Sequence, residues 1–218
     1  MNCWYQQGCN LYFENCEKTC HRFLEMKYLI ENCGMPDADS YIKPLIPENS
    51  DLQSYLRLNT IKENIVEFVN NGQNLYIVSE KFGNGKTTWS LKLLYKYFDE
   101  IWCGNGFKPR GYFIYVPELL NQLSSFAFKT SEDYKQLHKI ITTIDLVIWD
   151  DIGCSKLSQN DCTNLSTLLD SRNLKRKSNI YTGNLLSEEL REAIGNRLHN
   201  RIWDSSEIVK FVGRGRRC

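Results

Sequence analysis

The sequence predicts an α/β fold built on a five-stranded parallel sheet. Five short runs of the chain are almost continuously apolar, and longer stretches of helical character separate them. Strands that are apolar on both faces are typical of parallel sheets, in which helices connect the strands and cover both sides. The size agrees, because 218 residues, 42% hydrophobic and 24% charged, suit one globular domain with a small appendage.

The elements can be placed in chain order. A first helix begins at Ser50 or Asp51, either of which can cap it, continues with apolar residues at helical spacing, and ends at Gly72. The strands are expected at residues 75–78, 112–116, 146–149, 179–182 and 208–212. The helices between them are expected at about 87–102, 117–127, 131–141, 160–175 and 187–203.

Prolines mark a boundary near the start of the chain. Three of the five prolines lie between residues 35 and 47, and proline continues neither a helix nor a sheet ladder. We therefore expect a small Cys-rich head at residues 1–35, a linker at 36–50 and a body at 51–218. The body has the size of an ordinary domain.

The cysteines of the head predict a zinc site. Five of the nine cysteines lie within the first 33 residues, and neither their odd total nor the N-terminal sequence suits a secreted disulfide framework. Metal often replaces a core in so short a segment. The predicted zinc ligands are Cys3, Cys9, Cys16 and Cys20, with Cys33 or His21 as alternative fourth ligands. The alternative is that these cysteines are small buried hydrophobic residues.

Charge and hydropathy limit the functions that the composition can support. The net charge of +1 is too small to indicate nucleic-acid binding by itself. The longest apolar runs are far shorter than a membrane span, and the N-terminus has no signal-peptide pattern. We expect a cytoplasmic protein without membrane contact.

The segment after the first strand is typical of a phosphate-binding loop. Gly85-Lys86-Thr87 stands between a strand and a helix, where backbone N–H groups and the helix N-terminus bind phosphate. Lys86 would reach the β- and γ-phosphates and Thr87 would bind Mg²⁺. Glu80 replaces the first glycine of the motif, and a simple glycine turn is the alternative. The expected nucleotide contacts are Lys81, Phe82, Gly83, Asn84, Gly85, Lys86, Thr87 and Thr88.

Polar residues also follow the third and fourth strands. Asp150 and Asp151 end the apolar run 146–149, at the edge where parallel sheets bind ligands. We assign Asp150 to the metal and Asp151 to the base that activates water. Asn184, after the next strand, would orient that water. Solvated turns are the alternative at both places.

In this order and spacing, the motifs resemble the AAA+ P-loop ATPases of the bacterial and phage replicative helicase-loader group (DnaC/DnaI type), to which IstB-like transposition helpers are related. The resemblance covers residues 50–217, and residues 1–35 more loosely. The segments that support it are 83–88, 147–153, 182–190, 197–202 and 207–217.

The resemblance implies a role for each matching residue. Lys86 and Thr87 match the Walker A pair, and Asp150 with Asp151 the Walker B pair, where the family usually has Asp-Glu. Asn184 matches the sensor 1 asparagine. Arg201, with Arg197 as second choice, matches the arginine finger that acts on a neighbouring subunit, and Arg217 matches sensor 2. The group also tends to lack a full helical lid, as expected here.

The resemblance further implies a function. The protein would use ATP and Mg²⁺, form a homo-oligomer, bind a replicative DNA helicase and help place it on single-stranded DNA. The alternatives are an IstB-like transposition helper and a nucleotide-binding adaptor with negligible hydrolysis. The basic run 172–177 is one candidate DNA contact, although a solvated helix end is its ordinary interpretation.

Overall fold

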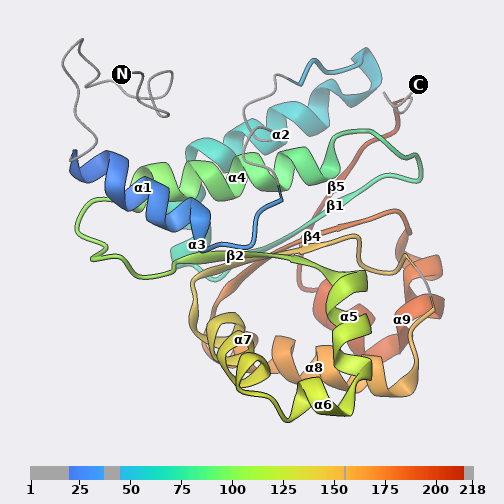
Figure 1. Ribbon diagram of the computed structural model, residues 1–218. Coiled ribbons are helices and arrows are strands. Elements are labelled where there is room, and N and C mark those ends of the chain that lie inside the picture. The colour runs from blue at the N-terminus through green and yellow to red at the C-terminus, as the bar shows by residue number, and fades with distance from the viewer. Residues whose placement is uncertain (1–19, 37–44, 155, 214–218) are drawn as a thin grey trace.

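Figure 1 shows the computed structural model, which describes residues 20–36, 45–154 and 156–213. In these residues the strands form one parallel sheet in the order β2-β3-β4-β1-β5, which confirms the predicted fold class. The strands are β1 (Asn74–Val78), β2 (Gly111–Tyr115), β3 (Leu146–Asp150), β4 (Ser178–Gly183) and β5 (Glu207–Lys210).

Helices cover both faces of the sheet (Figure 1). One layer contains α1 (His21–Glu31), α2 (Leu52–Glu63), α3 (Ile65–Asn70) and α4 (Lys86–Ile101). The other contains α5 (Val116–Ser124), α6 (Phe126–Lys129), α7 (Glu132–Thr143), α8 (Gln159–Leu174) and α9 (Ser187–Ile202). Successive strand residues face opposite layers, so Ile77 packs in the first core and Tyr76 and Val78 in the second.

The described part of the predicted head shares the core of the body. Met26 and Leu29 on α1 and Cys33 after it are buried in the same cluster as residues of α2, α3 and α4. The backbone N–H of Phe113 on β2 donates to the carbonyl oxygen of Cys33 at 2.6 Å. Helix α1 is therefore an outer helix of the first layer.

The cysteines divide between the described and undescribed parts of the chain. Cys3, Cys9 and Cys16 lie outside the described residues, and Cys20 is an exposed thiol. Cys33 is a buried hydrophobic residue, because its thiol donates to a backbone carbonyl and burial raises its pKa to about 12. Over residues 20–36, 45–154 and 156–213, no group of three or more candidate ligands is placed to hold a metal ion.

Two expected helices are interrupted. The helix predicted from residue 51 to Gly72 is two helices, because Asn64 leaves the helical conformation and its side chain donates to the carbonyl of Thr60 at 2.9 Å. Asparagine competes in this way for backbone hydrogen bonds. Likewise, the helix predicted at 117–127 ends at Ser124, and α6 follows after Ser125.

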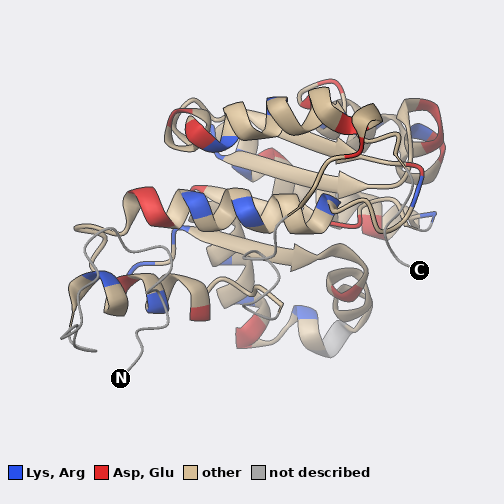
Figure 2. Cartoon of the chain, turned by 90° about the horizontal axis from the view of Figure 1, so that it is seen from above, with Lys and Arg blue, Asp and Glu red and all other residues tan. Residues whose placement is uncertain are grey.

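Most cations of the basic run 172–177 form contacts that stabilise the fold. Arg172 is fully buried and donates to four backbone carbonyls and to Asn179. Lys177 pairs with Asp145 at 2.6 Å, and Lys175 donates to the carbonyl of Thr142 at 3.0 Å. Three of the four cations in this run are therefore used within the fold and are not available for the DNA contact considered above. Figure 2 shows cations and anions mixed along the helices seen from above.

Among the described residues, no helix combines the length and apolar character needed to cross a membrane. No helix follows β5 in the described part of the chain, which ends at residue 213.

Candidate nucleotide-binding site

The loop between β1 and α4 has the conformation of a phosphate cradle. Gly83 and Gly85 have φ angles of 77° and 85°, a left-handed conformation that only glycine adopts at little cost. The 16-residue helix α4 starts directly after Gly85, so its N-terminal N–H groups and positive dipole end face the loop. A Cβ atom at Gly85 would lie 3.3 Å from Leu45, which closes the loop on its outer side.

Lys86 and Asn84 hold the loop together. The Lys86 ammonium donates to the carbonyl oxygen of Lys81 at 3.2 Å and lies 3.5 Å from that of Ser79, so its charge sits over the loop. Asn84 is buried, and its amide donates to the Ser79 hydroxyl at 2.9 Å and to the carbonyl of Gly213 at 2.8 Å. The loop is thereby tied to the segment that follows β5.

Glu80 does not place its carboxylate on the phosphates. It forms an ion pair of 3.0 Å with Lys210 on β5, the neighbouring strand. The negative charge of Glu80, which replaces the first glycine of the motif, is therefore balanced by Lys210. The phosphate-binding loop keeps its positive charge.

Asp150 and Thr87 form a ready pair of magnesium ligands. The Thr87 hydroxyl donates to Asp150 at 2.8 Å, and the Thr182 hydroxyl donates to the same oxygen at 2.7 Å. Burial raises the pKa of Asp150, while the two hydroxyl bonds and the charge of Lys86 oppose that rise. A divalent cation beside this buried carboxylate would stabilise its charged form.

Asp151 and Asn184 meet at the carboxyl ends of β3 and β4. The Asn184 amide donates to the Asp151 carboxylate at 3.2 Å, and the Asp151 backbone N–H donates to the Thr182 hydroxyl at 3.0 Å. The Asn184 carbonyl oxygen is buried and has no hydrogen-bond partner within the described chain. The amide of Asn184 therefore lies against the Asp151 carboxylate, at the edge of the sheet where the predicted water would bind.

These groups line one cleft of about 400 Å³. The predicted residues that line it are Phe82, Gly83, Asn84, Gly85, Lys86, Thr87, Thr88, Asp150, Asp151 and Asn184. Three lining residues were missed as site residues, namely Leu45, Tyr115 and Thr182. Of these, Thr182 alone had a signal in the sequence, because it begins the segment 182–190 that contains Asn184. The size and donors of the cleft fit a nucleoside triphosphate with Mg²⁺.

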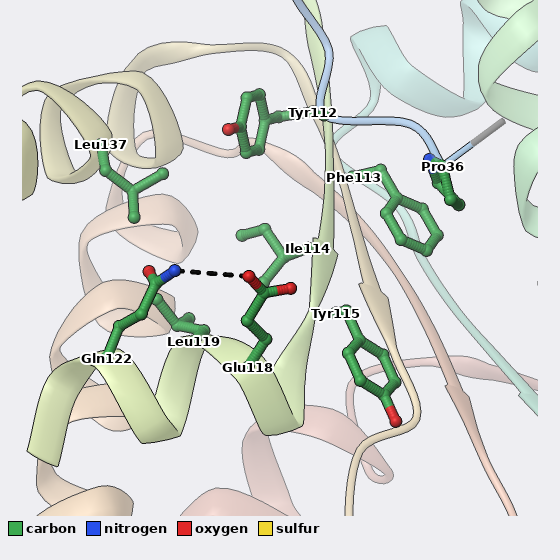
Figure 3. Close-up of a pocket in the computed structure, with 10 residues that line it drawn as sticks. Pro36, Tyr112, Phe113, Ile114, Tyr115, Glu118, Leu119, Gln122 and Leu137 are labelled. Carbon is green, nitrogen blue, oxygen red and sulfur yellow. Dashed lines mark hydrogen bonds between the residues drawn. The ribbon is translucent and has the colours of Figure 1, made fainter. Parts of the chain in front are cut away.

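A second cavity of about 380 Å³ adjoins this cleft along the outer edge of β2 (Figure 3). Tyr112, Leu119 and Leu137 give it apolar walls, and Glu118 accepts a hydrogen bond from Gln122. Tyr115 lines both cavities, so they meet at the carboxyl end of β2.

Two predicted site residues, Lys81 and Arg201, are not among the residues that line the cleft. The Lys81 ammonium donates to the carbonyl of Val212 at 3.3 Å and lies outside the lining. Arg201 lies near the C-terminal end of α9, where it pairs with Asp170 on α8, as does Arg197. Arg217 lies outside the described residues.

A parallel sheet in this strand order, with a phosphate cradle after β1 and paired carboxylates after β3, defines a P-loop nucleotide-binding protein of the AAA+ class. The particular family follows from the sequence. The chain belongs to the family of IstB-like ATP binding proteins, whose family model matches residues 53–216. No curated protein matches the chain.

Solved structures share the fold. The DnaC helicase loader has a TM-score of 0.67 at 21% identity, with 80% of this chain and 99% of that chain covered. DnaI gives 0.66 at 17% identity, with 88% and 99% covered. A putative primosome component from Streptococcus pyogenes serotype M3 gives 0.63 at 15% identity, with 92% and 100% covered.

Replacing Lys86 with alanine is expected to weaken ATP binding by about 10- to 100-fold, because hydrogen bonds to charged groups contribute about 1.5–3 kcal/mol. Calorimetric titration with a non-hydrolysable ATP analogue measures this loss. Lys96→Ala is the matched control, since Lys96 pairs with Glu100 at the far end of the same helix. Equal affinities of the two variants would contradict the site.

Proposed function

We propose that this chain is an ATPase of the helicase-loader type, which binds a replicative DNA helicase in the cytoplasm and helps place it on single-stranded DNA. The observation that supports it most directly is the cluster of Thr87, Asp150, Asp151 and Asn184 around the cradle. The fold likeness to the DnaC helicase loader and to DnaI supports the choice of process.

Each of these residues has a separate role in ATP hydrolysis. The glycine loop and Lys86 bind the β- and γ-phosphates, and Thr87 with Asp150 holds Mg²⁺. Bound Mg²⁺ supplies positive charge to the phosphate oxygens. Asn184 orients the attacking water through its amide group next to Asp151, and Asp151 accepts the proton from that water. Asp151 is one methylene shorter than the family's usual glutamate, so slow turnover is expected.

The site is completed by a second copy of the chain. Arg201 lies in the last turn of α9, beyond a kink at Gly195, and pairs with Asp170 on α8. It is not among the residues that line the cleft of its own chain. We therefore infer that Arg201 acts on ATP bound by a neighbouring subunit, which requires a homo-oligomer. Arg217 is proposed as the sensor 2 arginine.

The head is proposed to contact the helicase. Its cysteines Cys3, Cys9, Cys16 and Cys20 remain the proposed zinc ligands, and Cys20, the one described member, is exposed on the N-terminal side of α1. Metal analysis of the purified chain tests the zinc proposal.

One experiment distinguishes this function from its alternatives. We expect ATP hydrolysis by the purified chain to rise when single-stranded DNA and a replicative helicase are both added. Stimulation by double-stranded DNA without helicase would instead favour a transposition helper, which the family match also allows. Binding of ATP without turnover under every condition would favour a nucleotide-binding adaptor and would refute the ATPase.

A further inference from the structure

Asp170 on α8 accepts hydrogen bonds from both arginines of α9. The Arg201 guanidinium binds it side-on, with Nε donating to one carboxylate oxygen and Nη2 donating to the other at 3.1 Å. Arg197 donates to the second oxygen at 3.2 Å. Bidentate pairs of this kind fix the plane of the guanidinium as well as its position.

The same contacts leave part of Arg201 available. Its Nη1 donates to the carbonyl of Arg197 at 2.8 Å, so three of its five N–H groups have partners and two remain. The Arg201 side chain is 25% exposed, whereas that of Arg197 is 70% exposed. Arg201 is thus the more firmly oriented of the two, and it still presents donors to solvent.

Charge also favours an anion at this place. Two arginines share one carboxylate, which leaves one positive charge in excess within this group of three side chains. Hydrogen bonding from Arg201 holds the pKa of Asp170 below its usual range, so the carboxylate is ionised at neutral pH. Arg201 does not line the cleft of its own chain, so an anion that accepts hydrogen bonds from its two remaining N–H groups would belong to another molecule.

We propose that Asp170 is a positioning residue that orients Arg201 toward the γ-phosphate of ATP held by a neighbouring copy of the chain. This inference rests on the proposed function, in which Arg201 acts between subunits. A guanidinium oriented before the reaction stabilises the transition state without the cost of ordering it. Asp170 itself touches neither ATP nor water.

A purely structural role is the competing explanation, because Asp170 also links α8 to α9. The chain contains a matched pair for comparison. Arg57 on α2 binds Glu207 on β5 side-on through the same two nitrogens. Glu207→Gln therefore removes one charge from an equivalent bridge that the proposed site does not use.

The test uses mixtures of full-length variants. Lys86→Ala copies lack the ATP-binding lysine but carry Arg201, and Arg201→Ala copies bind ATP but lack the arginine. If the arginine acts between subunits, each variant is inactive alone, and an equal mixture recovers about a quarter of the wild-type rate. No recovery would refute the action of Arg201 between subunits, and with it the role of Asp170.

Asp170→Asn is then placed on one kind of copy at a time. On the Lys86→Ala copies, which supply the arginine, it is expected to lower the recovered kcat about tenfold with little change in KM. On the Arg201→Ala copies it is expected to change the rate less than about twofold. Glu207→Gln on either kind of copy is expected to have no such one-sided effect.

The proposal requires that Asp170→Asn lower the rate only on the copies that supply the arginine. Equal losses from both placements, no loss from either, or a higher rate from the added positive charge would overturn the proposal. Asp170→Glu serves as a second variant if Asp170→Asn lowers the unfolding temperature more than Glu207→Gln does. It keeps the charge and the bridge but displaces the guanidinium, so a loss on the arginine-supplying copies alone is again expected.

Discussion

Asp151→Asn is expected to lower kcat for ATP hydrolysis by about 10²- to 10⁴-fold while the affinity for ATP changes little. Asparagine removes the carboxylate that accepts the proton but keeps the size of the side chain. It also suits the backbone, because Asp151 has a φ angle of 61°, and Asn and Asp are the non-glycine residues that best tolerate this conformation. Steady-state kinetics and titration with an ATP analogue separate the two effects.

Asp133→Asn provides the control for this substitution. Asp133 is an exposed residue in the first turn of α7, away from the cleft, so the same chemical change there should leave kcat within about twofold of the wild type. If Asp151→Asn retains the wild-type kcat, the carboxylate is not the base, and the assignment of Asp151 is wrong.

The positive φ of Asp151 suits an aspartate at this position. Aspartate is one of the non-glycine residues that this left-handed backbone conformation accepts most readily. The sequence shows the aspartate but not the backbone conformation.

Local patterns predicted the sheet well, because each strand is defined by its own apolar run. Residues 146–149 and 179–182 are expected strands that the structure extends by one or two residues. The loop glycines and Lys86 were also identified, since adjacent residues build the cradle. Local sequence was sufficient for these elements, although it did not predict the helix breaks at Asn64 and Ser125.

Contacts between distant residues account for what sequence could not predict. Glu80 pairs with Lys210, which is 130 positions later in the chain. The motif alone therefore does not show that the Glu80 carboxylate is turned toward this cation. Thr182 binds Asp150 because β3 and β4 are neighbours in the sheet. Arg172 resembles an exposed cation at a helix end, yet burial between α7, α8 and the sheet gives it a structural role.

Arg201→Ala is expected to have the largest effect, a loss of about 10³-fold or more in kcat with ATP still bound, because an arginine finger contributes 10³ to 10⁵ in rate. The structure explains why the lost group is not replaced from within the same copy. The Arg201 side chain does not line the cleft of its own chain and is held by Asp170. Steady-state turnover by the pure variant gives the size of the effect.

Adding variant copies to the wild-type chain shows whether Arg201 acts on ATP bound by a neighbouring copy. A double variant, Lys86→Ala with Arg201→Ala, neither hydrolyses ATP nor supplies the arginine, and Lys86→Ala alone still supplies it. Added in equal amount to a fixed quantity of wild-type chain, the double variant is expected to halve turnover, whereas Lys86→Ala leaves it unchanged. Both variants occupy the same places in the oligomer, so the difference between them isolates Arg201. If the two variants act identically, Arg201 serves no neighbour, and the intersubunit site is wrong even where the pure Arg201→Ala variant is inactive.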